Sequence, residues 1–371
     1  METLETTPRF PTLIDPPDVL VVGAGLAGLA AARDLARAGL SVHVLDKSRG
    51  VSGRAATRWL EVDGRTVRVD HGAQHFTARG NQLRMTLPDL IANGTVREWA
   101  QSFPVLGEKG IEGREPERPR YVCPNGMSAL GKAFQRGFLP EDKALALETK
   151  ATAQSIVRGE ATGFWNVLLE DGRVRSGHYL ILNLPAPQAL KLGGDALKPE
   201  LRLALQSVRF DPCWAAMLVF EELPYLDWVG LEIRHPILGW AALDHTKRPL
   251  PDPPVLVLQT TPRWSREHLE LTSEEALRQI VGAAQELFGA WVGRYRLGVA
   301  HRWRYAFAAQ THPFAYLAQD NLVLCGDWCV EPGVLSMGTG RIEGALESGW
   351  AAADYILGRT SGLHSPAGET R

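Results

Sequence analysis

A glycine-rich turn between two apolar segments, close to the start of the chain, constrains the fold more than any other feature. From Asp18 the sequence reads DVLVVGAGLAGLAAARDLARAGLSVHVLDKS, which divides into a β-branched run, a glycine turn, an alanine-rich helix and a second apolar run. Gly23, Gly25 and Gly28 form the pattern G-x-G-x-x-G where the strand passes into the helix. The first glycine allows a tight turn, the second lets the backbone approach a pyrophosphate, and the third lets the helix pack on the strand. The sequence therefore predicts a βαβ unit that binds a dinucleotide at the helix N-terminus.

An acidic residue ends the second apolar run. Asp46 stands 18 residues after Gly28, where a carboxylate accepts hydrogen bonds from ribose hydroxyls. An acid at this position disfavours a 2′-phosphate, so we expect FAD or NAD rather than NADP as the bound dinucleotide. A loop rich in glycine and arginine follows at 49–54, and its backbone and Arg54 suit a pyrophosphate. Such a loop is frequent in flavoproteins and favours FAD.

Two further segments extend the predicted cofactor site. The segment 70–76, Asp-His-Gly-Ala-Gln-His-Phe, follows an apolar strand and suits a polar wall beside a flavin ring. Gly326 and Asp327 follow a predicted buried strand, where they would reach the phosphate and ribitol region at the carboxyl edge of the sheet. Apolar residues from Ile342 onward recur with helical spacing. The positive end of that C-terminal helix, near Gly340, can stabilise negative charge on a reduced flavin.

Composition argues against several other classes of protein. Lys and Arg number 40 and Asp and Glu 42, so the whole chain has no net positive charge that would attract nucleic acid or an anionic membrane. The longest apolar run, 19–32, is shorter than the ~20 residues that span a bilayer. The cysteines and histidines lack the spacing of a disulfide framework or a metal site. The acidic, proline-rich N-terminus lacks the features of a secretory signal, so we expect a soluble cytoplasmic protein. The charged run 114–120 is expected to be a solvated loop.

Taken together, these segments resemble those of the renalase-like branch of the flavin amine oxidase superfamily. Members of that branch carry a glycine-rich FAD loop, a G-R-x-x-T-R segment and a D-H-G-A-Q-H-F segment, which stand here at 23–28, 53–58 and 70–76. Ser52 occupies a position where related flavoproteins often have a second glycine. Shorter segments that also resemble the family stand at 182–188, 211–214, 300–306, 325–328 and 340–345.

The resemblance implies an α/β fold in which a Rossmann-like FAD-binding domain is interleaved with a mixed, mostly antiparallel β substrate domain. The expected pieces of the FAD-binding domain are 18–80, 140–190 and 318–358. The expected pieces of the substrate domain are 81–139 and 191–317, and the expected flexible tails are 1–17 and 359–371.

We expect FAD to be bound without a covalent link. Related amine oxidases often attach the flavin through a cysteine in a C-terminal stretch that corresponds to 332–340, and this stretch contains none. Ala151 is expected to lie against the adenine by resemblance alone. The residues expected to bind FAD are Gly23, Ala24, Gly25, Leu26, Ala27, Gly28, Asp46, Lys47, Gly53, Arg54, Arg58, His71, Gly72, Ala73, Gln74, Ala151, Gly326, Asp327, Gly340, Arg341 and Ile342.

Six side chains are candidates for the substrate pocket beside the flavin ring: Gln74, His75, Trp240, His245, His301 and Trp303. His75 stands out because it belongs to the most specific motif after the dinucleotide loop. The two tryptophans have an alternative as core residues, since tryptophan in an apolar run is usually packing. His245 has an alternative as a loop residue. His301 has alternatives as a holder of cofactor phosphate or a brace between the domains.

The resemblance implies a reaction as well as a fold. The substrate would be an isomer of NAD(P)H with its hydride misplaced on the nicotinamide ring, and hydride transfer to the flavin would give NAD(P)+. Molecular oxygen would reoxidise the flavin and form hydrogen peroxide. No general base is needed, because the substrate ring becomes aromatic as the hydride leaves. Two alternatives remain open: a flavin amine oxidase acting on a small amine, and a non-catalytic module that binds FAD or NAD.

Overall fold

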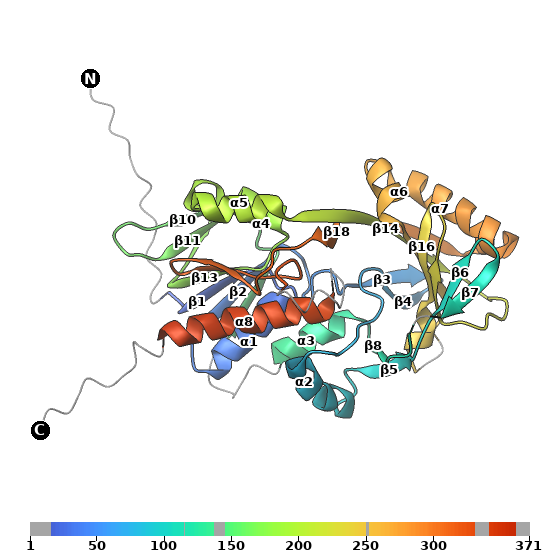
Figure 1. The fold of residues 1–371 in the computed structure, drawn as a ribbon, viewed down its shortest axis with the longest axis horizontal. Helices are drawn as coiled ribbons and strands as arrows, with labels where there is room; N and C mark the ends of the chain where they lie inside the picture. The colour runs from blue at the N-terminus through green and yellow to red at the C-terminus, as the bar shows by residue number, and fades with distance from the viewer. Residues whose placement is uncertain (1–15, 115, 137–144, 250–251, 331–340, 361–371) are drawn as a thin grey trace, which may run out of the picture.

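The computed structural model describes residues 16–114, 116–136, 145–249, 252–330 and 341–360 (Figure 1). These residues form a mostly parallel sheet covered by helices and a large, mostly antiparallel sheet joined to it by long strands (Figure 1). The α/β fold class predicted from the sequence is confirmed.

The glycine turn follows the carboxyl end of β1, a central strand of a six-stranded sheet with the order β19-β20-β13-β1-β2-β9. Its strands are β1 (Val19–Val22), β2 (Val42–Asp46), β9 (Leu145–Thr149), β13 (Tyr179–Leu182), β19 (Leu317–Gln319) and β20 (Leu322–Leu324). Each neighbouring pair is parallel except β19 with β20. Because the carboxyl ends of parallel strands meet at one edge, the residues after β1, β2, β13 and β20 come together there.

Helices cover one face of this sheet and a mixed layer covers the other. The first face carries α1 (Leu26–Arg37), α2 (Asn81–Ala92), α3 (Ser128–Arg136) and α8 (Ile342–Thr360), as Figure 1 shows. The second face carries β10 (Ala153–Arg158), β11 (Trp165–Leu169), β12 (Val174–Gly177), α4 (Ala186–Gly193), η1 (Gly194–Ala196) and α5 (Pro199–Ser207). A Cβ on Gly349 of α8 would lie 2.2 Å from the Ala27 oxygen of α1, so glycine allows these two helices to touch.

The large sheet has seven strands in the order β18-β14-β17-β16-β15-β6-β7. The bounds are β6 (Pro104–Gly107), β7 (Gly110–Arg114), β14 (Arg209–Val219), β15 (Gly230–Ile233), β16 (Leu238–Leu243), β17 (Val255–Thr260) and β18 (Leu297–Gln310). One face packs on α6 (Pro262–Glu267), α7 (Ser273–Phe288) and η3 (Ala290–Arg294). The other face packs on the hairpin of β3 (Thr57–Val62) and β4 (Arg65–Asp70).

Smaller elements lie outside the two large sheets. β5 (Arg97–Ala100) pairs with β8 (Arg120–Val122), and η2 (Asp244–Lys247) joins β16 to β17. The expected domain boundaries stay a prediction. Among the described residues, no helix combines the length and the apolar character that a membrane crossing requires.

Candidate cofactor and substrate site

The turn after β1 has room only for glycine. Gly23 has φ +106°, and a Cβ on it would lie 2.2 Å from the Asn183 oxygen. A Cβ on Gly28 would lie 2.2 Å from the Gly23 oxygen. Gly25 caps α1 without a side chain, so the first amides of the helix remain available to an anion. Asn183 Oδ1 is buried beside Gly25 and lacks a hydrogen-bond partner among the described residues, so a ligand hydroxyl would satisfy it. These features fit the pyrophosphate end of FAD.

Asp46 holds the neighbouring turn through its carboxylate. The Ala24 N–H donates to Oδ2 and the Ser48 N–H donates to Oδ1, both at 2.7 Å. The Ala151 N–H donates to the Asp46 carbonyl oxygen at 2.9 Å, so the structure brings these predicted residues together. A carboxylate can accept about four hydrogen bonds, and Asp46 therefore keeps capacity for ribose hydroxyls. Lys47 is exposed at the strand end.

The second glycine loop packs directly on the first. The Ser52 N–H donates to the Ala24 oxygen at 2.8 Å, and a Cβ on Gly53 would lie 3.2 Å from Gly25 Cα. Ser52 has φ +88°, a left-handed conformation that favours glycine. This explains why related flavoproteins have glycine there.

Arg54 connects this loop to the turn after β20. Its guanidinium donates two hydrogen bonds to the buried Asp327 carboxylate, at 2.6 and 2.9 Å. The pair brings two predicted FAD-binding residues side by side, next to Gly326. At the start of α8, Arg341 is exposed and Ile342 is buried, whereas Gly340 lies outside the described residues.

The turn 71–75 is held between the cofactor loops and the large sheet. A Cβ on Gly72 would lie 1.9 Å from the Arg54 oxygen, so this turn lies directly on the second loop. From the large sheet, Trp303 Nε1 donates to the His71 oxygen and Gln259 Nε2 donates to the Gly72 oxygen, both at 2.8 Å. The predicted flavin-facing turn, which includes Ala73, is therefore fixed from both sides.

Three predicted residues form one aromatic group beside this turn. The ring centroids of His71, His301 and Trp303 lie 4.5 to 5.2 Å apart. Burial, then His301 and Arg58, lowers the pKa of His71 to about 3. Burial and Arg58 lower the pKa of His301 to about 4. Both imidazoles are therefore neutral at pH 7.

His75 belongs to a second aromatic group. Its ring centroid lies 4.9 Å from Phe103, 5.5 Å from Trp240 and 6.4 Å from Trp99. Two buried polar atoms of this group, His75 Nδ1 and Trp240 Nε1, have no hydrogen-bond partner in the described part of the chain. Unsatisfied polar atoms inside an aromatic cluster suit a ligand with hydrogen-bonding groups. Trp99 and Phe103 were not singled out from the sequence, where only their aromatic character marks them.

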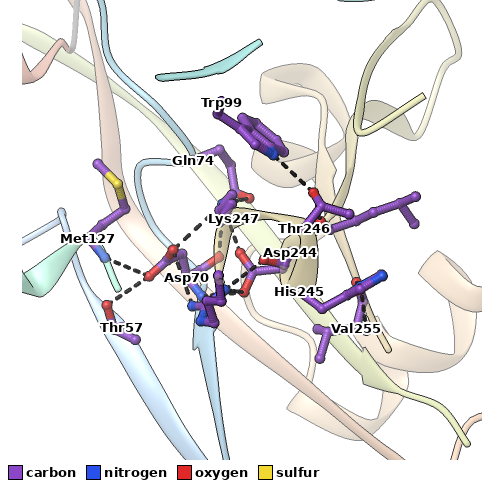
Figure 2. A network of polar contacts seen from close by, with 12 residues as sticks. Thr57, Asp70, Gln74, Trp99, Met127, Asp244, His245, Thr246, Lys247 and Val255 are labelled. Atoms are coloured by element: carbon purple, nitrogen blue, oxygen red, sulfur yellow. Dashed lines mark hydrogen bonds and ion pairs between the residues drawn. The ribbon is translucent and has the colours of Figure 1, made fainter. Parts of the chain in front are cut away.

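The side chain of Gln74 points from the turn 71–75 toward Asp70 and Lys247. Its Nε2 donates to the oxygens of Asp70 and Gly72, at 2.5 and 3.1 Å, and its Oε1 accepts from Lys247 Nζ at 3.0 Å. Figure 2 shows Gln74 above a buried network that includes Asp70, Asp244 and Lys247. These contacts suit a residue that fixes the turn. Its predicted contact with FAD or substrate stays a prediction.

His245 lies apart from the aromatic groups. Its Nδ1 accepts from the Val255 N–H at 3.1 Å, and Figure 2 shows the ring beside Val255, on the far side of η2 from Gln74. The contact ties the start of β17 to η2. The structure does not bring His245 together with His75 and Trp240, and its place in the pocket stays a prediction.

Arginines gather beside the second aromatic group. Arg120 is buried, and its guanidinium carbon lies 5.7 Å from the centroid of the Phe103 ring. Burial, Arg118 and Arg120 lower the pKa of Arg79, while Glu343 opposes that shift, so these side chains lie within electrostatic reach of one another. The expectation of a solvated loop at 114–120 is wrong for Arg120, because β8 pairs with β5 and draws this residue inward.

The cysteines have the character of packing residues. All four are free and buried. Burial raises the pKa of Cys213 and Cys325 to about 12, so their thiols remain protonated at pH 7. Such thiols are poor nucleophiles, which fits a non-covalent flavin.

Two family models match the chain. The model described as flavin containing amine oxidoreductase matches residues 108–357, and the model of an NAD(P)-binding Rossmann-like domain matches residues 21–89. Together they reach from the glycine turn to α8.

Individual relatives match shorter stretches or the fold alone. Lysine-specific histone demethylase 1 homolog 3 of Oryza sativa subsp. indica is 41% identical over 87 residues, which is 23% of this chain and 10% of the demethylase. A putative flavin-containing monooxygenase, FMO GS-OX-like 11 of Arabidopsis thaliana, is 30% identical over 151 residues, which is 40% of this chain and 84% of that protein. A structure of putrescine oxidase bound to putrescine superposes with a TM-score of 0.70 at 16% identity, covering 94% of this chain and 100% of the oxidase. At that identity the likeness shows a shared fold.

Proposed function

This chain belongs to the flavin containing amine oxidoreductase family, and from that premise we propose that it oxidises isomeric dihydro forms of NAD(P)H to NAD(P)+, as a renalase-like enzyme. It is an FAD-dependent oxidoreductase of that family, and it binds FAD non-covalently. FAD bound there would supply the acceptor for a hydride, and molecular oxygen would take up the two electrons and form hydrogen peroxide. The protein binds and orients the substrate.

Different parts of the site would hold different parts of FAD. The glycine turn and the α1 N-terminus suit the pyrophosphate, and Asp46 suits the adenosine ribose. Ala151 would contact the adenine, while the Arg54 and Asp327 pair would contact the ribitol and phosphate region. The turn 71–75 would lie along the flavin ring, with the two aromatic groups next to it.

The observation that carries the choice of substrate is the charge around His75. Burial first, and then the charges of Arg120, Lys247 and Arg341, together lower the pKa of His75 to about 3. Lys247 is paired with Asp244, 2.8 Å away, and Arg120 and Arg341 also have partners of their own, so the positive charge around His75 is partly balanced. A protonated amine would be repelled there, whereas a dinucleotide with negative phosphates would be attracted.

The neutral polar groups fit the same substrate. His75 Nδ1 and Trp240 Nε1 are buried and unsatisfied among the described residues, and the carboxamide of a dihydronicotinamide carries both donors and an acceptor. An uncharged His75 neither takes nor gives a proton at pH 7, which suits hydride transfer without a base. We propose that these two side chains orient the nicotinamide ring against the flavin.

Anaerobic flavin reduction tests the proposal directly. The purified yellow protein would be mixed separately with pure NADH, with NADH containing its ring isomers, and with putrescine, spermidine and benzylamine. We expect rapid bleaching of the flavin only with the isomers. The isomeric dihydronicotinamide riboside lacks phosphate. At saturation it should also bleach the flavin, but it should need a higher concentration than the isomeric NADH to reach half of the maximal rate. Absence of bleaching by every isomer would reject the proposal.

A second candidate function is oxidation of a small uncharged amine. The aromatic side chains of His75, Trp99, Phe103 and Trp240 would exclude water around such a substrate, and the fold is shared with a putrescine oxidase. Bleaching by an amine in the same experiment would favour this function. Bleaching by none of the compounds would favour a non-catalytic flavin-binding module.

We also propose that the protein is cytoplasmic and that the chain is divided into an FAD-binding domain and a substrate domain. Four free, buried cysteines suit the reducing conditions of the cytoplasm. Within the described residues, two separate apolar cores surround the parallel sheet and a third lies under the seven-stranded sheet, which supports an FAD-binding domain beside a substrate domain.

A further inference from the structure

A fully buried ionic network lies directly behind the turn 71–75. The side chains of Asp70, Asp244, Lys247 and Arg248 have no solvent exposure. Lys247 Nζ lies 2.8 Å from Asp244 Oδ1 and 3.7 Å from Asp70 Oδ2. Arg248 lies 2.7 Å from Asp244 Oδ2 and 3.4 Å from Asp70 Oδ2. Two carboxylates therefore share two cations at the junction of β4 with η2.

Stability alone does not account for this network. Burial and the neighbouring Asp244 raise the pKa of Asp70, which shows the cost of placing these carboxylates together away from water. Burial also acts to raise the pKa of Asp244, but Lys247 and Arg248 outweigh it and hold this pKa below its usual value. Apolar residues of similar volume often stabilise a core as well as a buried ionic network does. The network is therefore better explained by the side chains that it holds in place.

Lys247 and Arg248 differ in what they reach. Lys247 Nζ donates to Gln74 Oε1 at 3.0 Å and lies 5.1 Å from the centroid of the Trp99 ring. The residue before it, Thr246, accepts a hydrogen bond from Trp99 Nε1 at 2.9 Å. The ion pairs of the Arg248 guanidinium lead instead to Asp70, Asp244 and Asp252. We call the aromatic group of His75, Trp99, Phe103 and Trp240 the His75 wall. Of the two cations, Lys247 is the one that contacts both Trp99 in this wall and Gln74 in the turn that carries His75.

We propose that Lys247 is a positioning residue that sets the wall of the substrate pocket. Through Gln74 it fixes the turn that carries His71 and His75, and through its cation–π contact it fixes Trp99. The carboxylates of Asp70 and Asp244 hold the ammonium group between these two contacts. The inference rests on the proposed function, because it takes the His75 wall to be the place where substrate meets flavin.

Two charge-balanced double variants test the inference. Asp244→Asn with Lys247→Met removes one acid and one base, including the cation that reaches Gln74. Asp244→Asn with Arg248→Met removes the same charges, and Lys247 is still held by the Asp70 carboxylate and by the amide oxygen of the new side chain at position 244. We expect similar thermal stability for both. Flavin reduction should slow about 10-fold to 100-fold in the Lys247 variant and stay within about twofold in the Arg248 variant. The KM for substrate should change less than the rate.

Readouts without substrate keep the inference testable by itself. The visible absorption spectrum of bound FAD and the tryptophan fluorescence should change in the Lys247 variant and match the wild type in the Arg248 variant. Equal rates and spectra in the two variants would overturn the inference. If the Lys247 variant fails to fold, Gln74→Leu removes the same contact without removing a charge, and it should reproduce the loss of rate and the altered spectrum; unchanged values would overturn the inference. If no dihydronicotinamide isomer reduces the wild type, the proposed function fails, and the spectra still decide the role of Lys247.

Discussion

The pyrophosphate end of the site and the His75 wall are built on different principles. The first consists of backbone: Gly23, Gly25 and Gly28 bring main-chain atoms so close that a side chain would collide with them. The second consists of side chains, and His75 meets rings from β16 and from the region around β5. The backbone site depends on sequence-local geometry, and the side-chain wall depends on contacts between distant segments. Substitutions should therefore affect the two regions in separable ways.

The largest expected effect is loss of FAD from the backbone site. In Gly28→Ala the new Cβ would lie 2.2 Å from the Gly23 oxygen, so α1 must move away from the turn. We expect FAD binding to weaken about 100-fold, because the helix N-terminus no longer faces the pyrophosphate. The flavin-to-protein absorbance ratio after purification and a flavin titration measure this. Gly282→Ala, in α7, is the matched control, since no neighbouring part of the fold lies within 4 Å of its new Cβ.

The next effect separates chemistry from cofactor binding. His75→Ala removes one ring and one hydrogen-bonding atom from the wall and leaves the glycine loops untouched. We expect flavin reduction by substrate to slow about 10-fold to 100-fold, while FAD affinity changes less than about threefold. Stopped-flow bleaching and a flavin titration measure the two quantities. Trp59→Ala, which removes an exposed ring on β3, should change neither. Unchanged reduction kinetics in His75→Ala would remove this residue from the pocket.

The buried histidines also make stability depend on pH. The pKa of His75 and of His71 falls from 6.5 to about 3, mainly because of burial, so each ring takes up its proton when the chain unfolds. Between about pH 6.5 and pH 3 the unfolded state binds more protons. The free energy of unfolding is therefore highest above about pH 6.5 and decreases as the pH falls through this interval.

A glutamine at position 75 isolates the contribution of one ring. In His75→Gln the pH slope of the unfolding free energy should decrease by about 1.4 kcal/mol per pH unit between about pH 4 and 6. Urea unfolding at several pH values measures the slope, which does not depend on packing changes that shift all values equally. An unchanged slope in His75→Gln would show that this ring is charged in the folded protein.

The same contrast explains what the sequence could predict. The βαβ unit, Asp46 and the α/β fold class follow from local spacing, because each depends on strand, turn and helix geometry within one segment. The capping box of Thr272 and Glu275 at the start of α7 is local in the same way, since both residues lie within one helical turn. The sequence predicts only two members of the second aromatic group, His75 and Trp240. Nothing in it indicates that Trp99 and Phe103 contact these two residues. Such meetings depend on how β5, β6 and β16 are placed by the whole fold.

Charge was the hardest property to assign from the sequence. Lys247 stands in a polar stretch between two strands and gives no sign of complete burial, yet its side chain has no exposed surface. Arg120 ends a run of charged residues and is buried all the same. In both cases a partner distant in sequence decides the outcome: Asp70 for Lys247, and the aromatic ring of Phe103 for Arg120.

The smallest expected effect concerns the junction of the two glycine loops. Ser52 has φ +88°, which costs about 1 kcal/mol for a residue other than glycine, but its hydroxyl donates to the Ser128 oxygen and accepts from the Gly131 N–H. Ser52→Gly relieves the strain and loses both hydrogen bonds, so the free energy of unfolding should stay within about 1 kcal/mol of the wild type. Ser52→Ala keeps the strain and loses the bonds, and should destabilise by about 2 kcal/mol. Urea unfolding of the two variants measures the difference, and equal stabilities would show that the left-handed backbone at position 52 carries no strain.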